Sequence, residues 1–184
     1  MDGIYLLSLL TLLSNLALLF LVLLFVYSKT TGEKLWNQIE KKLLKYSILF
    51  SFIVTLTATL GSLYLSEVRG FAPCVLCWYQ RVFMYPLPFI LGTSLVKKTK
   101  EVFYYVLPLS TIGSLISSYH YYMQLSPDAL VPCSTVGFSV SCSERFFTYF
   151  NYITIPWMAL SAFVITILLM LIVKLNLKDR SSRV

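Results

Sequence analysis

Five long apolar stretches constrain this chain more than any other feature of its sequence. A helix needs about 20 apolar residues to cross the hydrocarbon core of a bilayer, and each stretch meets that length. The chain is 58% hydrophobic and only 12% charged, which leaves more apolar surface than a soluble globule can bury. We therefore expect an all-α integral membrane protein. The predicted spans are Ile4–Tyr27, Tyr46–Leu65, Trp78–Val96, Val102–Met123 and Ile153–Val173.

The first stretch lies where a secretory signal would lie, but its sequence argues against removal. No basic segment precedes it, its apolar run is too long, and no small-residue cleavage site follows Tyr27. We expect it to be retained as an additional helix beside a four-helix transmembrane bundle. The predicted division is an extra helix with a basic loop at residues 1–45, the bundle at 46–173 and a basic tail at 174–184.

The 15 lysines and arginines are distributed unevenly along the chain. All but Arg69, Arg81 and Arg145 lie between spans one and two, between spans three and four, or after span five. Because basic loops stay in the cytoplasm, we expect a multi-pass cell-membrane protein with its N-terminus outside and its C-terminus in the cytoplasm. Topology and lipid headgroups then account for the net charge of +7, and we expect no nucleic-acid binding.

The same orientation places all four cysteines outside the cytoplasm, where disulfides form and persist. Cys74 and Cys77 lie just before the third span, and Cys133 and Cys142 lie in the loop between the fourth and fifth spans. The orientation and the cysteine positions depend on different residues, and they agree on the compartment.

The segment from Pro73 to Arg81, Pro-Cys-Val-Leu-Cys-Trp-Tyr-Gln-Arg, carries the most specific chemistry. Proline is favoured at the first helical position, so we expect the helix to begin at Pro73 with both cysteines on one face of its first turn. The helix dipole and Arg81, four residues after Cys77, favour the reactive thiolate. This pattern predicts a redox-active Cys74–Cys77 pair, because an inert staple across so short a loop would add little stability.

Cys133 and Cys142 are separated by an uncharged spacer with Gly137 near its middle. Taken alone, they could form a structural bridge in a small loop. Beside a CxxC pair on the same membrane face, they could instead be a second redox pair that exchanges electrons with the first. A zinc site is disfavoured because the two pairs are too far apart in sequence for a zinc ribbon, and we assign no metal.

Electrons that enter the CxxC pair need an acceptor, and the sequence has no nucleotide-binding, haem or ferredoxin motif. A membrane quinone, either ubiquinone or menaquinone, fits because its ring can lie among apolar side chains while its carbonyls accept hydrogen bonds. Arg81 and His120 are the candidate donors, although a histidine at this depth can also only anchor its helix. The segment 143–150, polar and then aromatic, predicts a short interfacial helix.

These motifs resemble those of the DsbB family of disulfide bond formation proteins, over about Tyr46 to Val173. The resemblance implies a quinone-dependent oxidoreductase that reoxidises a DsbA-like thioredoxin-fold thiol oxidase. The residues that carry it are Pro73-Cys-x-x-Cys-Trp-Tyr-Gln-Arg81, His120-x-x-Met-Gln124-Leu-x-Pro127, Cys142-x-Glu-Arg145 and Pro156-Trp157.

By the same resemblance, the partner attacks the Cys133–Cys142 disulfide at Cys133, and the Cys74–Cys77 pair reoxidises this loop pair. Cys77 then passes electrons to the quinone beside Arg81, and the quinol returns to the membrane pool. Two features depart from the family pattern: the additional N-terminal span and the short spacer between the loop cysteines.

Two alternatives remain open at this point. A vitamin K epoxide reductase-like oxidase also couples thiols to quinones within a membrane bundle, but in that family the loop cysteines precede the CxxC pair. The other alternative is a non-enzymatic membrane scaffold with structural disulfides. Reduction of a quinone by the purified protein and a dithiol partner would exclude the scaffold.

The predicted orientation can be tested by chemical labelling of intact cells. After mild reduction, a membrane-impermeant maleimide should modify Cys133 or Cys142, because both are expected outside the cytoplasm. In a Ser181→Cys variant, the introduced thiol should stay unmodified until the cells are lysed. The reverse pattern would contradict both the orientation and the redox compartment.

Overall fold

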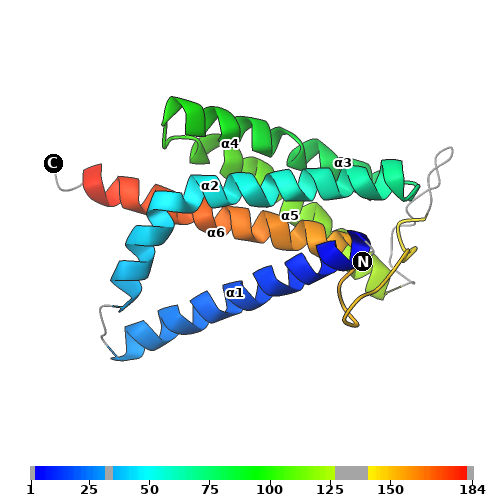
Figure 1. The fold of residues 1–184 in the computed structure, drawn as a ribbon, viewed down its shortest axis with the longest axis horizontal. Coiled ribbons are helices and arrows are strands. Elements are labelled where there is room, and N and C mark those ends of the chain that lie inside the picture. Colours follow the sequence, from blue (N-terminus) through cyan, green and yellow to red (C-terminus); the bar gives the residue numbers. More distant parts are fainter. Residues whose placement is uncertain (1–2, 32–34, 127–140, 182–184) are drawn as a thin grey trace.

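The structure is a computed structural model that describes residues 3–31, 35–126 and 141–181 (Figure 1). Within these ranges the chain forms helices and no strand longer than the isolated bridge between Tyr149 and Ile153. This confirms the predicted all-α fold. The helices are α1 (Gly3–Thr31), α2 (Leu35–Leu63), the π-helical turn η1 (Tyr64–Val68), α3 (Val75–Met84), α4 (Pro86–Lys97), α5 (Phe103–Leu125) and α6 (Ile155–Ser181).

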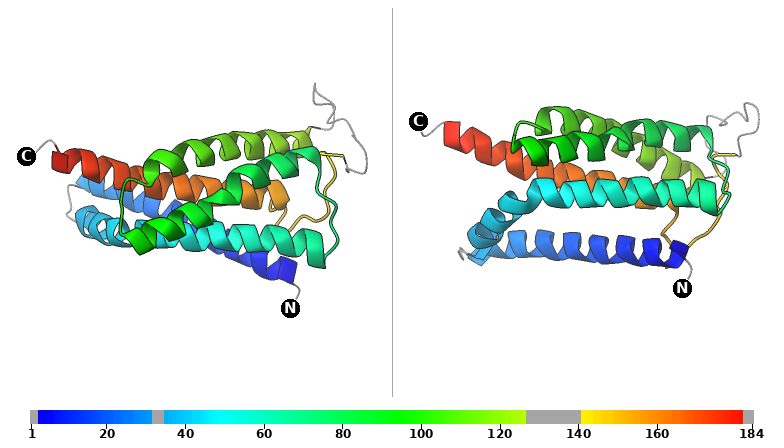
Figure 2. Two further views of the ribbon diagram at one scale, coloured as in Figure 1. Left: turned by 90° about the horizontal axis from the view of Figure 1, so that it is seen from above. Right: turned by 45° about the horizontal axis from the view of Figure 1, so that its top comes forward.

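Helices α2 to α6 form a bundle, and α1 lies along one side of it (Figures 1 and 2). α6 packs along α5 and α2, α4 packs on α2, and α3 packs on α5. A Cβ added at Gly113 of α5 would overlap the ring of Phe163 of α6, so glycine is what allows these helices to approach closely. The buried core consists of Met84, Leu87, Leu91, Val102, Phe103, Val106, Ala162, Phe163, Met170 and Val173.

Three helical segments in the described residues are long and apolar enough to cross a membrane: Gly3–Ser28, Leu43–Val68 and Ile155–Leu177. They correspond to the first, second and fifth predicted spans. α5, with 23 residues, has the length of a fourth span. These helices make the chain an all-α, multi-pass membrane protein.

The third predicted span is two helices rather than one. α3 ends at Met84, α4 begins at Pro86, and Tyr85 lies between them. A proline lacks the backbone N–H and clashes with the carbonyl four residues earlier, so Pro86 ends one helix and is tolerated only at the start of the next. With 10 and 12 residues, α3 and α4 are each too short to cross a bilayer alone.

The two ends of the bundle differ in charge and in cysteine content. The starts of α1, α3 and α6 and the end of α5 lie together at one end, which carries Cys74 and Cys142 and is called the cysteine end below (Figures 1 and 2). The α4–α5 turn, with Lys97 and Lys98, and the C-terminal end of α6 lie at the opposite end. Basic residues and cysteines are therefore separated as predicted, while the side of the membrane that each end faces stays a prediction.

The predicted interfacial helix over residues 143–150 is wrong. This segment is a chain of turns, and Phe150 and Asn151 have positive φ angles of 51° and 64° that a helix does not allow. Aromatic contacts replace helical hydrogen bonds here, since the ring of Phe146 stacks on that of Phe71 with centroids 4.7 Å apart. The segment is therefore held by side-chain packing against the cysteine end.

Candidate functional site

Cys74 caps the N-terminus of α3. Its backbone is extended (φ −74°, ψ 171°), so the first helical residue is Val75 and the helix begins two residues later than predicted from Pro73. Its Sγ accepts a hydrogen bond from the backbone N–H of Cys77 at 3.3 Å, the contact that a serine or aspartate oxygen makes in ordinary N-caps. The sulfur thus lies where the unpaired N–H groups and the helix dipole favour negative charge.

The Cys74 and Cys77 sulfurs are 2.9 Å apart, and both cysteines are free thiols. Covalently bonded sulfurs would lie about 2.05 Å apart, so the structure shows the reduced pair, with one thiol hydrogen-bonded to the other. Cys74 is buried and Cys77 is partly buried. The structure therefore brings the predicted redox pair within bonding reach at the cysteine end.

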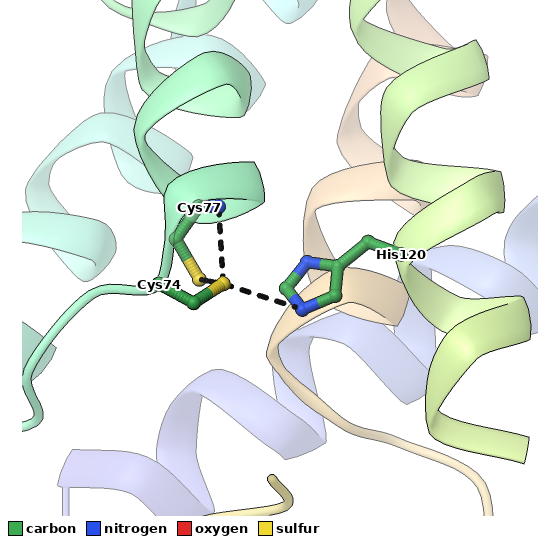
Figure 3. A group of neighbouring side chains, drawn as sticks. All are labelled: Cys74, Cys77 and His120. Atoms are coloured by element: carbon green, nitrogen blue, oxygen red, sulfur yellow. Dashed lines mark hydrogen bonds between the residues drawn. The ribbon is translucent and has the colours of Figure 1, made fainter. Parts of the chain in front are cut away.

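His120 of α5 faces Cys74 across the site (Figure 3). Its Nε2 lies 3.6 Å from Cys74 Sγ and 3.2 Å from the carbonyl oxygen of Cys142. Its Nδ1 lies 3.0 Å from the side-chain amide nitrogen of Gln80. An amide NH₂ can only donate, so Nδ1 accepts, and in the neutral ring the proton is on Nε2. This N–H is directed at the Cys74 sulfur and the Cys142 carbonyl.

The two thiols of the pair differ in acidity. The hydrogen bond from Cys77, together with the contact with His120, lowers the pKa of Cys74 to about 4. Burial acts in the opposite direction but does not outweigh these contacts. The hydrogen bond to Cys74, together with burial, raises the pKa of Cys77, and the charge of Arg81 offsets only part of this. Cys74 is therefore the thiolate of the reduced pair, and Cys77 holds the proton.

Cys142 links the second predicted pair to the first. It is fully buried, it takes part in a disulfide, and it packs in one cluster with Cys74 and Met123. Cys133 lies outside the described residues, so its pairing with Cys142 stays a prediction. The structure thus places one member of the loop pair in the same buried cluster as Cys74, and His120 contacts both.

Gln124 and Arg145, which belong to the sequence motifs but have no predicted function, hold the Cys142 segment in place. The side-chain amide of Gln124 donates to the carbonyl of Glu144 at 3.1 Å, and Arg145 Nε donates to the carbonyl of Gln124 at 3.0 Å. These contacts join the end of α5 to the chain that follows Cys142. The signal was present in the spacing of the two motifs, four residues from His120 to Gln124 and three from Cys142 to Arg145.

A cavity of about 310 Å³ lies beside Cys77. Cys77, Gln80 and Arg81 line it beside the pair, and Ser62 and Tyr85, whose hydroxyls are 3.2 Å apart, add further polar groups. The rest of its wall is mostly apolar and comes from α1, α2 and α6. An apolar cavity with a few polar groups at one place is typical of a site for an organic ligand.

Arg81 is held at the cavity wall by two contacts. Its Nη2 donates to the carbonyl of Ser62 at 3.4 Å, and its guanidinium carbon lies 5.2 Å from the centre of the Trp78 ring. The side chain is partly buried, four residues after Cys77. It can therefore present donor groups to a ligand beside the Cys77 sulfur.

His120, the second predicted quinone donor, is not among the residues that line this cavity. His120 contacts Cys74, and Cys74 does not line the cavity either. Of the CxxC pair, Cys77 is the member that lines the cavity. The geometry therefore gives no support for the predicted contact of His120 with a quinone and points instead to a role at the Cys74 sulfur.

The ligand atoms of Cys74, Cys77 and His120 lie within 4.8 Å of one another, so these residues need testing as a metal site. Two thiolates on one tetrahedral zinc ion would lie about 3.8 Å apart, given Zn–S bonds of about 2.3 Å. The observed sulfur separation of 2.9 Å suits a thiol hydrogen bond instead. We assign no metal to the site.

Comparisons of the sequence with known proteins identify the family that it matches. The sequence matches the family described as disulfide bond formation protein DsbB over residues 45–173. Disulfide bond formation protein C of Bacillus subtilis (strain 168) is 46% identical over 126 residues, which cover 67% of this chain and 89% of that protein. The probable disulfide formation protein C of Halalkalibacterium halodurans is 43% identical over 129 residues, 68% of this chain and 91% of that protein. No solved structure matches.

Replacement of His120 by alanine should raise the pKa of Cys74. A hydrogen bond to a charged group is worth about 1.5–3 kcal/mol, so its loss should raise this pKa by about one to two units. The measurement is the rate of Cys74 alkylation by iodoacetamide against pH in the reduced protein, followed by peptide mass spectrometry.

In the wild type, alkylation should increase through pH 4 and then level off, because the thiolate is present above the lowered pKa. In His120→Ala the same increase should occur at higher pH. Tyr119→Phe, on the exposed side of the same helix, is the matched control and should keep the wild-type profile. An unchanged profile in His120→Ala would show that His120 does not act on this sulfur.

Proposed function

Because the chain belongs to the DsbB family of disulfide bond formation proteins, we propose that it oxidises a thioredoxin-fold thiol partner and passes the electrons to a membrane quinone. Family membership makes the chain a membrane thiol–disulfide oxidoreductase and disfavours the two alternatives left open above. The finer proposal is carried by one observation: Cys74 shares a buried cluster with Cys142, while Cys77 lines an apolar cavity that neither of these two cysteines lines.

The first half of the proposed reaction transfers electrons from the partner to the loop cysteines. A thiolate of the partner attacks Cys133 of the Cys133–Cys142 disulfide, forms a mixed disulfide and releases Cys142. The second thiol of the partner then resolves this bond. The partner gains a disulfide, and the loop pair holds the two electrons as two thiols.

The second half transfers these electrons to the CxxC pair. Cys142 packs against Cys74, so we assign the attack to the Cys74 sulfur of the Cys74–Cys77 disulfide, which releases Cys77 beside the cavity. Cys133 then attacks Cys142, reforms the loop disulfide and expels Cys74. A thiol with a pKa of about 4 is a good leaving group, and His120 directs its Nε2 at this sulfur.

The residues around the cavity suit a quinone. Cys77 and the positive charge of Arg81 are adjacent, and once Cys74 is bonded to Cys142 it can no longer accept the Cys77 proton. The main cause of the raised Cys77 pKa is then absent, and Arg81 favours the thiolate. Arg81 and Tyr85 can donate to the carbonyls of a ring that lies beside Cys77. A bound quinone would supply a two-electron, two-proton acceptor that restores the Cys74–Cys77 disulfide.

Arg81→Ala should raise the KM for quinone. Loss of a hydrogen bond from a charged donor costs about 1.5–3 kcal/mol, so KM should rise about 10- to 100-fold in steady-state assays with a soluble quinone. Arg69→Ala, which removes an exposed arginine from the same end of the molecule, is the control and should keep the wild-type KM. Wild-type quinone kinetics in folded Arg81→Ala would exclude Arg81 from the quinone site.

The entry point for electrons can be tested by trapping the mixed disulfide with a partner that retains only its attacking cysteine. In Cys142→Ala the loop has no disulfide, so the attacking cysteine of the partner is supplied as its mixed disulfide with 2-nitro-5-thiobenzoate. Cys133 should attack this disulfide, release the thiobenzoate and form a stable covalent complex, because no neighbouring loop thiol remains to resolve it. Cys133→Ala should not trap the complex. Non-reducing gels measure both outcomes, and equal trapping by the two variants would show that entry at Cys133 is wrong.

A further inference from the structure

The cavity beside Cys77 has one wall that lies outside the matched residues 45–173, and that wall is α1. Leu7, Leu10, Thr11 and Ser14 of α1 all line the cavity. Their spacing of three, one and three residues places them on a single face of the helix. One face of the additional helix is therefore part of the cavity.

The first turns of α1 are docked firmly on the bundle at the cysteine end. Ile4 and Ser8 are buried, and the ring of Tyr5 contacts that of Tyr149 with centroids 6.0 Å apart. A Cβ added at Gly61 of α2 would lie 3.0 Å from Leu7 Cδ2, so the Leu7 side chain packs closely on α2 at this glycine. These contacts hold the cavity-lining face of α1 in place.

Toward its C-terminal end, α1 diverges from the bundle (Figure 1). In its second half, the apolar side chains of Leu19, Phe20 and Leu23 are exposed. The cavity is lined by Cys77 and, on α1, by residues as far as Ser14. The next part of α1 presents apolar side chains to lipid.

The polar residues on the lining face of α1 act as small residues and not as donors. Thr11 Oγ1 donates to the carbonyl of Leu7 at 2.9 Å, and Ser14 Oγ donates to that of Thr11 at 2.8 Å. Both hydroxyls are therefore satisfied within their own helix, so this wall offers space and apolar contact. Cys77, Gln80, Arg81 and Tyr85 place several donor groups together on another part of the cavity wall.

From this arrangement we infer that α1 forms the wall that binds the apolar isoprenoid tail of the quinone, with Thr11 and Ser14 keeping room for it. The inference rests on the proposed function, because the ring is assigned to the Cys77 end of the same cavity. It commits to one occupant, a hydrocarbon chain covalently attached to the ring, because the apolar wall is continuous with the redox site. The additional helix would then determine which tails are accepted.

Filling the space at Ser14 should separate tail binding from ring binding. In full-length Ser14→Leu, the KM for a quinone with an isoprenoid tail should rise roughly tenfold, since the added side chain overpacks the tail site. The KM for a quinone that carries a methyl group in place of the tail should not change. Ala17→Leu adds similar bulk to an exposed position of the same helix and should leave both KM values unchanged.

A binding measurement without turnover completes the test. A quinone with a photoreactive group on its tail should form adducts on the α1 peptide in the wild type and fewer in Ser14→Leu, as mapped by mass spectrometry. If both quinones are affected equally, or if the adducts avoid α1 while the wild type reduces quinone, the tail assignment is wrong and the proposed function stands. If the wild type neither binds nor reduces any quinone, the proposed function fails and the inference fails with it.

Discussion

The hydrogen bonds that converge on Cys74 Sγ join the parts of the molecule on which the chemistry depends. The sulfur accepts from the Cys77 backbone N–H at the start of α3, contacts the Cys77 thiol, and lies 3.6 Å from His120 Nε2 of α5. His120 Nε2 also lies 3.2 Å from the carbonyl of Cys142. A single histidine thereby connects both cysteine segments, and its ring is oriented by Gln80 from the helix that carries the CxxC pair.

These contacts give the two cysteines of the CxxC pair different surroundings and different chemistry. Cys74 is a buried, stabilised thiolate beside Cys142, and Cys77 is a protonated thiol on the wall of an apolar cavity. In the proposed exchange Cys74 is the sulfur expelled when Cys133 attacks Cys142, and its low pKa makes it a good leaving group. Electron transfer to a membrane acceptor needs the other sulfur to lie where an apolar ligand can approach. Cys74 caps α3 and Cys77 lies in its first turn, so two cysteines only three residues apart can serve these two different steps.

The sequence predicted the features that depend on local pattern. The apolar runs of α1, α2, α5 and α6, the separation of basic residues from cysteines, and the CxxC pair at a helix start all follow from spacing and composition. The break at Pro86 follows from proline chemistry, although the apolar run continues through it and gives one predicted span for two helices. The contacts of His120 with Cys74 and Gln80 join residues 46 and 40 positions apart, so they depend on how α3 and α5 pack, which no local pattern encodes.

The central claim is that Cys74 exchanges with Cys142 while Cys77 remains on the cavity side. The most direct measurement is the disulfide that forms on addition of the thiol oxidant diamide when only one cysteine of each pair is left, determined by mass spectrometry of unreduced peptides. We expect Cys77→Ser combined with Cys133→Ser to form a Cys74–Cys142 disulfide readily, because these two residues lie in one buried cluster. Cys74→Ser combined with Cys133→Ser should leave Cys77 and Cys142 as free thiols. Efficient formation of a Cys77–Cys142 disulfide in the second variant, without a Cys74–Cys142 disulfide in the first, would show that the proposed exchange is wrong.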